Sequence, residues 1–151
     1  MSALKDRLQA DLTAAMKARD EVTTATLRML LTAVGTEEVA GKAARELSDD
    51  EVLKVVAREA KKRREAATAF ADGGRPDRAE RELAEERVLA GYLPAQLSDE
   101  ELQELVRAAV ESTGASGPKD MGAVMKAVVP QVSGRADGGR VSAAVKAALQ
   151  G

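Results

Sequence analysis

The sequence predicts an all-α protein, and three observations support this fold class. Apolar residues recur at intervals of three and four along nearly the whole chain, the spacing that places them on one face of an α-helix. Two segments have the pattern of a helix capping box, and glycine or proline stands between the periodic stretches. Hydrophobic residues make up 44% and charged residues 32% of the 151 residues, a balance typical of a folded protein.

Two amphipathic helices are predicted at the start of the chain. The apolar stripe of the first consists of Leu4, Leu8, Leu12, Ala15 and Met16. The stripe of the second consists of Leu27, Leu30, Leu31 and Val34. This second helix is expected to run until Gly41, because the apolar spacing persists up to that glycine.

A third and a fourth helix follow. The third is expected to begin at Ser48 and to end near Asp72-Gly73-Gly74, because paired glycines favour a helix end. One face of it carries Val52, Val56, Ala60, Ala67 and Phe70. The fourth is shorter and is expected from about Pro76 or Asp77 to Gly91. These helices form the predicted N-terminal domain, residues 1–91.

Two helix starts are marked by capping boxes. In the first, Ser48 is the predicted N-cap and Glu51 the N3 residue, with Leu47 and Val52 placed as a hydrophobic staple. The same device returns at Leu97-Ser98-Asp99-Glu100-Glu101-Leu102. The similarity between the two segments fades within two turns, so they are interpreted as independent helix starts rather than an internal repeat.

A packed apolar connector is predicted between the two boxes, at residues 92–97, because its leucines and Tyr92 favour packing against neighbouring residues. Pro94 breaks the helix and restricts Leu93 to extended conformations. Three helices fit the remainder, at about 98–112, 118–132 and 138–149, and form a predicted C-terminal domain, residues 98–151. Pro118 suits a first helical turn, Pro130 is expected to kink or end its helix, and Asp137 is the expected N-cap of the last helix.

Composition excludes several kinds of site. The chain has no Cys and no His, which removes thiol nucleophiles, zinc–thiolate sites and the commonest general base. Tyr92 and Phe70 are its only aromatic residues, too few for a base-stacking platform. We therefore expect no catalytic residues, no cofactor and no metal. Neither a signal peptide nor a membrane span is predicted, so a cytoplasmic location is expected.

Several short motifs together resemble the GatB/YqeY family. In chain order they are Leu27-Arg28-Met29-Leu30, Arg58-Glu59-Ala60-Lys61-Lys62-Arg63-Arg64-Glu65, Gly73-Gly74-Arg75, Tyr92-Leu93-Pro94-Ala95-Gln96-Leu97-Ser98, Met121-Gly122-Ala123-Val124-Met125 and Gly134-Arg135-Ala136-Asp137-Gly138. The resemblance covers nearly the whole chain. It implies a helical YqeY N-terminal domain and a three-helix C-terminal domain similar to the tail domain of GatB, a subunit of the glutamine-dependent tRNA amidotransferase.

The resemblance also implies a link to tRNA, because the tail domain contacts tRNA in the amidotransferase. An activity as a carbon–nitrogen ligase with glutamine as amido-N-donor is implied only by analogy. At four positions where the family often carries a basic residue, this chain has Gly35, Ala123, Gln131 and Ser133. These replacements reduce the positive surface expected to meet RNA.

Two groups of basic residues are candidate RNA contacts. The first lies on the third helix and comprises Lys54, Arg58, Lys61, Lys62, Arg63 and Arg64. Against Glu59 and Glu65, these six cations give a local charge of +4, which suits phosphate contacts without base reading. The alternative is an ordinary solvated helix face.

The second group follows from the family analogy and comprises Lys119, Lys126, Arg135, Arg140 and Lys146. We expect the side chains of Lys126, Arg140 and Lys146 at solvent-facing positions. The turn at residues 134–139 exposes backbone amides near a helix start, where anions are favoured. The alternative is an ordinary turn between helices.

Three hypotheses about function remain open at this point. The first is a non-catalytic accessory protein that binds tRNA, or another structured RNA, through basic helix faces. The second is an adaptor that docks another protein on exposed helix faces. The third is a component of a glutamine-dependent carbon–nitrogen ligase, which would need partner subunits.

Overall fold

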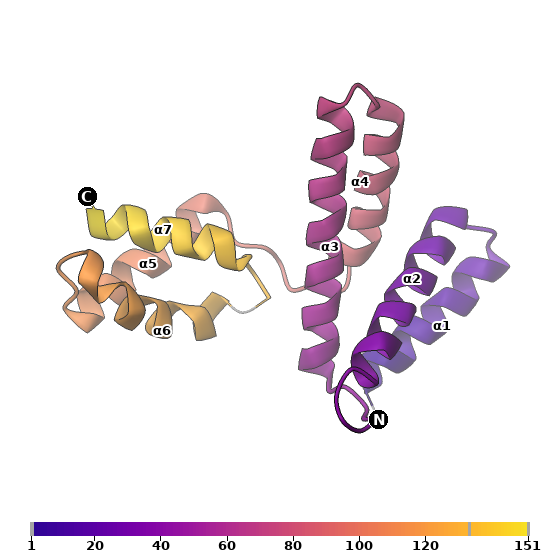
Figure 1. The fold of residues 1–151 in the computed structure, drawn as a ribbon, viewed down its shortest axis with the longest axis horizontal. Coiled ribbons are helices and arrows are strands. Elements are labelled where there is room, and N and C mark those ends of the chain that lie inside the picture. Colours follow the sequence, from indigo (N-terminus) through magenta and orange to yellow (C-terminus); the bar gives the residue numbers. More distant parts are fainter. Residues whose placement is uncertain (1, 133, 151) are drawn as a thin grey trace. The chain divides into compact units, whose positions relative to one another are not determined.

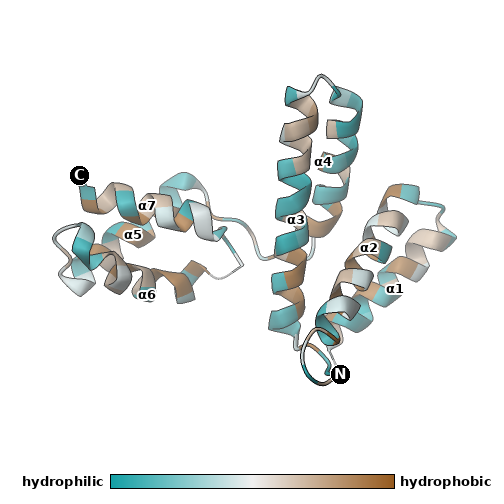
Figure 2. Ribbon diagram, viewed as in Figure 1, coloured by the Kyte–Doolittle hydropathy of each residue, from teal (hydrophilic) through white to brown (hydrophobic). Residues whose placement is uncertain are grey.

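The computed structural model describes residues 2–132 and 134–150, and within them it contains seven α-helices, one 3₁₀ helix and no strand (Figure 1). The predicted all-α fold class is therefore confirmed. Ser133, one of the positions that lost a basic residue, lies outside the described residues. Hydrophobic and hydrophilic residues share each helix, as expected of amphipathic helices packed against one another (Figure 2).

The contacts divide the chain into two compact units, Met1–Leu93 and Pro94–Gly151. The division falls inside the predicted connector. Tyr92 and Leu93 pack against the core of the first unit, and Leu97 is buried in the core of the second. The finer division into residues 1–91, 92–97 and 98–151 stays a prediction.

The N-terminal unit contains α1 (Ala3–Lys17), α2 (Glu21–Glu38), α3 (Asp49–Asp72) and α4 (Pro76–Ala90). The helices α1 and α2 pack side by side, and so do α3 and α4. The fully enclosed core brings all four helices together and includes Leu8, Leu27, Leu30, Val34, Val52, Val56 and Leu89. Each of these residues lies on the apolar stripe of its helix, so burial of one face is what orders this unit.

The C-terminal unit contains α5 (Asp99–Thr113), a 3₁₀ turn η1 (Pro118–Asp120), α6 (Met121–Val132) and α7 (Gly138–Gln150). Each α-helix of this unit packs against the other two. The shared core includes Leu97, Leu102, Val106, Val124, Val128, Val141 and Val145. Valine and leucine predominate in it, together with Ala109 and the partly buried Met121 and Met125, and this unit has no aromatic residue.

The three predicted helix caps agree with the structure. Ser48 and Ser98 each accept a hydrogen bond from the N3 backbone N–H, and the N3 glutamate accepts one from the serine N–H, so both capping boxes are complete. Asp137 accepts a bond from the Arg140 N–H at 3.0 Å and begins α7 as predicted. These caps satisfy amide groups that have no partner inside the helix.

Three expectations about the helices need correction. The second helix ends at Glu38 rather than Gly41, because Val39 and Ala40 already donate to carbonyls three residues back and the Glu38 carbonyl accepts from Arg45. The residues from Pro118 form a 3₁₀ turn before α6 begins. Met16, placed in the first apolar stripe, is 49% exposed. Apart from these three corrections, Pro130, which was expected to kink or end its helix, lies within α6, and α6 ends two residues later at Val132.

Candidate functional site

The basic residues of α3 lie close to carboxylates. Arg58 pairs with Glu37 at 3.5 Å, a contact to the neighbouring helix α2. Along α3 itself, Lys62 lies 3.0 Å from Glu59 and Lys61 lies 4.0 Å from Glu65. Lys54 is exposed and forms no ion pair with another described residue. Most of the positive charge on this face is therefore balanced locally, which favours the solvated-face interpretation over a phosphate-binding strip.

Arg63 is not part of that surface, so the local charge of +4 is wrong as a surface charge. Its side chain is only 9% exposed and lies between α3 and α4, where Nε is 3.0 Å from a carboxylate oxygen of Glu85. Glu59 and Glu82 lie farther off, at 3.9 and 3.8 Å from the guanidinium. Burial, together with the nearby Glu85 carboxylate, raises the pKa of Glu82. Arg63 thus serves as the central cation of a buried acidic cluster.

Periodicity could have located Arg63. It lies seven residues after Val56 and four before Ala67, both of which are buried, so it shares their helix face. The signal was hidden because Arg63 stands inside a run of four consecutive basic residues, of which the other three are exposed.

Two candidate residues of the C-terminal unit have structural partners. Arg140 donates to the Leu97 carbonyl at 3.0 Å and to Asp99 Oδ1 at 2.8 Å. Arg135 donates from Nε to the Ala95 carbonyl at 3.4 Å. Both side chains are partly buried rather than free at the surface, which corrects the solvent-facing position expected for Arg140. Their bonds to the Ala95 and Leu97 carbonyls stabilise the segment that leads into α5.

Three lysines of the same unit remain exposed. Lys119 lies in η1, where its positive charge helps to lower the pKa of the adjacent Asp120. Lys126 projects from α6 and Lys146 from α7, and neither forms an ion pair with another described residue. Lys126 and Lys146 are therefore the candidates with free positive charge in this unit.

Two of the quoted motifs meet in the C-terminal unit. The Leu97 N–H donates to the Arg135 carbonyl at 2.8 Å, and the Gln96 side chain donates to the Gly134 carbonyl at 2.9 Å. Gly134 has φ +75°, and a Cβ placed there would lie 3.6 Å from Cγ of Pro94. The turn between α6 and α7 therefore has a specific partner and is more than a simple connection.

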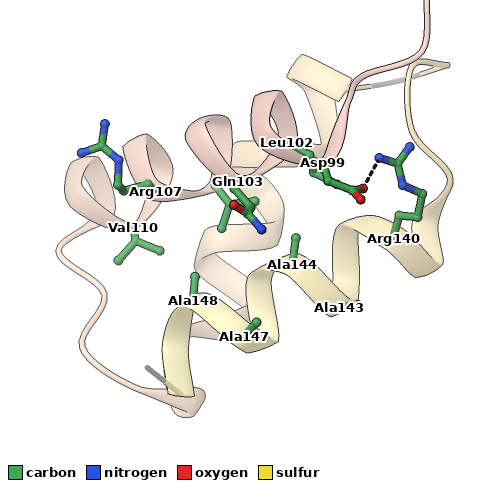
Figure 3. Close-up of a pocket in the computed structure, with 11 residues that line it drawn as sticks. Asp99, Leu102, Gln103, Arg107, Val110, Arg140, Ala143, Ala144, Ala147 and Ala148 are labelled. Carbon is green, nitrogen blue, oxygen red and sulfur yellow. Dashed lines mark hydrogen bonds and ion pairs between the residues drawn. The ribbon is translucent and has the colours of Figure 1, made fainter.

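A groove between α5 and α7 is the second candidate site, and sequence reasoning missed it. Its volume is about 680 Å³, and apolar side chains predominate among the residues that line it. From α5 come Leu102, Val106 and Val110, and from α7 come Ala143, Ala144, Ala147 and Ala148. The Asp99–Arg140 ion pair closes one end, and Arg107 stands on the rim near the other (Figure 3). Because α5 and α7 have small or branched apolar residues here, the groove can accept an apolar surface.

Tyr92, in the predicted connector, serves a structural role. Its hydroxyl donates to Asp11 Oδ2 at 2.6 Å, and the Arg7 guanidinium lies 4.8 Å from its ring centroid. Burial and the Asp11 carboxylate raise its pKa, so the phenol stays protonated and keeps donating to α1.

The part of the chain that the structure describes contains neither an acidic metal site nor a membrane-spanning helix. Within residues 2–132 and 134–150, no three acidic side chains are arranged to hold a metal ion. None of the helices in that same part of the chain combines the length and apolar character needed to cross a bilayer.

Comparison with known proteins decides the family. A family model described as YqeY-like protein matches residues 5–149. The chain belongs to the YqeY-like protein family. No curated protein matches it closely enough to count as a relative. The match spans both units of this YqeY-like protein, so the α3 face, the junction between Pro94 and Gly134 and the α5–α7 groove all lie within the family region.

Proposed function

We propose that this YqeY-like protein is a non-catalytic accessory protein of tRNA metabolism whose C-terminal unit binds structured RNA through phosphate contacts. Free cationic side chains are the observation that carries the proposal. Lys126 and Lys146 are exposed on two packed helices and have no carboxylate partner among the described residues. The resemblance of this unit to the tRNA-contacting tail domain of GatB supports the same function.

The contrast with α3 sharpens the proposal. Lys61 and Lys62 have the same chemistry as Lys126 and Lys146, but each already lies near a glutamate. An RNA phosphate would have to compete with those glutamates, whereas it meets Lys126 and Lys146 without competition. Aromatic stacking contributes nothing in this unit, since both aromatic residues lie in the other one. The expected binding is weak and independent of RNA sequence.

Salt dependence tests the proposal. Binding of folded tRNA to the full chain is measured by fluorescence anisotropy over a series of salt concentrations. Each lost phosphate contact reduces the salt slope by about one, so Lys126→Ala/Lys146→Ala should lower it by up to about two. The matched double variant Lys61→Ala/Lys62→Ala should leave the slope nearly unchanged. No tRNA binding by the unaltered protein at low salt would rule the proposal out.

A protein-binding adaptor is the second candidate, favoured by exposed apolar residues of the N-terminal unit. Met16 and Met29 are each 49% exposed and Val39 is 64% exposed. A partner protein that co-purifies with the unaltered chain and is lost with Met29→Glu, at unchanged helicity, would support this function. Activity as part of a glutamine-dependent ligase would require residues from other subunits, since this chain has neither Cys nor His.

A further inference from the structure

The α7 side of the groove between α5 and α7 consists mainly of short alanine side chains. Ala143, Ala147 and Ala148 are exposed on α7, and none of them has a side chain long enough to hold another helix away. Across from them Val106 and Val110 line the α5 wall. Within the described residues of the C-terminal unit, no helix covers this groove (Figure 3). A helix laid along it would bury apolar surface on two sides.

The charges on α5 indicate which helix would fit. Asp99 and Glu100 lie in its first turn, and Arg107 lies two turns later on the rim of the groove. All three residues are exposed. Glu100 forms no ion pair with another described residue, and only one carboxylate oxygen of Asp99 is bonded to Arg140. A helix run antiparallel to α5 thus meets an acidic surface at one end and a cation at the other.

We propose that the occupant is α5 of a second copy of this chain, in a two-fold symmetric, antiparallel pair centred near Gln103. In that arrangement Arg107 of each copy lies over the acidic first turn of the other, and Glu100 is its partner. The Arg107–Glu100 pair forms twice, because a two-fold interface uses the same surface on both molecules.

Helix orientation favours the same arrangement. The Asp99–Arg140 pair joins the N-terminal ends of α5 and α7, which run in the same direction along the groove (Figure 3). Their dipoles are therefore aligned, and an antiparallel third helix opposes both. Val110, which is only partly buried in the single chain, becomes covered in each copy together with the exposed alanines of the other.

The existing partners of Arg107 leave it available. It pairs with Glu104 and Glu111 along its own helix, and all three side chains are more than 60% exposed. Exposed pairs of this kind contribute little to stability, so Arg107 can exchange one of them for Glu100 of the other copy at a small cost in free energy.

Sedimentation velocity of the full chain, from micromolar to submillimolar concentration, provides the first test. The unaltered protein should form a dimer. Ala147→Glu places a charge in the groove and should weaken dimerisation at least tenfold. The matched variant Ala123→Glu changes an exposed alanine of α6 outside the groove and should dimerise as the unaltered chain does. A protein that stays monomeric throughout, or an Ala147→Glu variant that still dimerises, would refute the proposal.

A charge exchange tests the orientation. Arg107→Glu and Glu100→Lys should each weaken the dimer, because each brings like charges together across the two-fold axis. The double variant should restore it, since both pairs re-form with opposite signs. Circular dichroism establishes that the three variants stay helical. A double variant that dimerises no better than the single ones would exclude the antiparallel α5 pair.

Discussion

Arg63 Nε lies 3.0 Å from a carboxylate oxygen of Glu85, and both side chains are about nine-tenths buried between α3 and α4. Glu85 also accepts a bond from Arg81, which in turn pairs with Glu21 of α2. One chain of charged contacts therefore links α2, α4 and α3. Such clusters cost free energy to desolvate, so they stabilise the fold only while every charge keeps its partner.

Arg63→Met should destabilise the N-terminal unit by about 3 kcal/mol, because it removes the buried cation that Glu59, Glu82 and Glu85 share, although Glu59 keeps Lys62 and Glu85 keeps Arg81. Urea unfolding followed by far-ultraviolet circular dichroism measures the loss. Arg64→Ala is the matched control: this neighbour is exposed and pairs with Glu86 at 3.3 Å, so its removal should cost about 1 kcal/mol or less. If both variants lower the free energy of unfolding by the same amount, the buried cluster contributes no more to stability than the exposed Arg64–Glu86 pair.

Gly134→Ala should destabilise the C-terminal unit by about 1–2 kcal/mol, because φ of +75° is unfavourable for a residue with a Cβ. Gly122→Ala is the control in the same unit. Gly122 lies in α6 with open space around it, so alanine there should stabilise by up to about 1 kcal/mol. Thermal melts that shift in the same direction for both variants would contradict this assignment.

Ser48→Ala and Ser98→Ala should each destabilise by about 0.5–2 kcal/mol, since each removes the hydroxyl that accepts the N3 amide. Ser48 begins a helix of the first unit and Ser98 one of the second, so each loss should appear in its own unit. Ser112→Ala provides the comparison, because that hydroxyl bonds only to a carbonyl within α5. Thermal melts of the three variants distinguish the caps from the comparison residue.

Acid should weaken the start of α3 through Glu51. Bonds from the Arg45 guanidinium and from the Ser48 N–H lower the pKa of Glu51 from 4.5 to about 2. Because the folded pKa lies below the unfolded one, this contribution is present above about pH 4.5 and is lost as the pH falls toward 2. Glu51→Gln should therefore lower the melting temperature at pH 6 and make little difference at pH 2. A difference that persists at pH 2 would mean that ionisation of Glu51 is not responsible.

Sequence patterns predicted the local features of this fold and missed those that depend on packing between helices. Ser48, Ser98 and Asp137 were identifiable as caps because a cap needs only its own neighbouring amides. The groove was not, because periodicity shows that α5 and α7 are amphipathic but not that Val110 and Ala147 are left uncovered. Arg140 was predicted as a surface cation, and the Leu97 carbonyl that holds it lies more than forty residues away.

The bond between Gln96 and Gly134 spans 38 residues and, with the Leu97–Arg135 bond, closes α5 and α6 into a single loop. Local contacts between α5 and α6, and the Ser98 capping box at the start of α5, can form before that closure, but the two bonds from Gln96 and Leu97 cannot. Folding of this unit should therefore finish with the turn after α6, and a fragment cut before Arg135 should collapse without reaching a unique structure. We therefore expect the closure at Gly134 to form late in the folding of this unit.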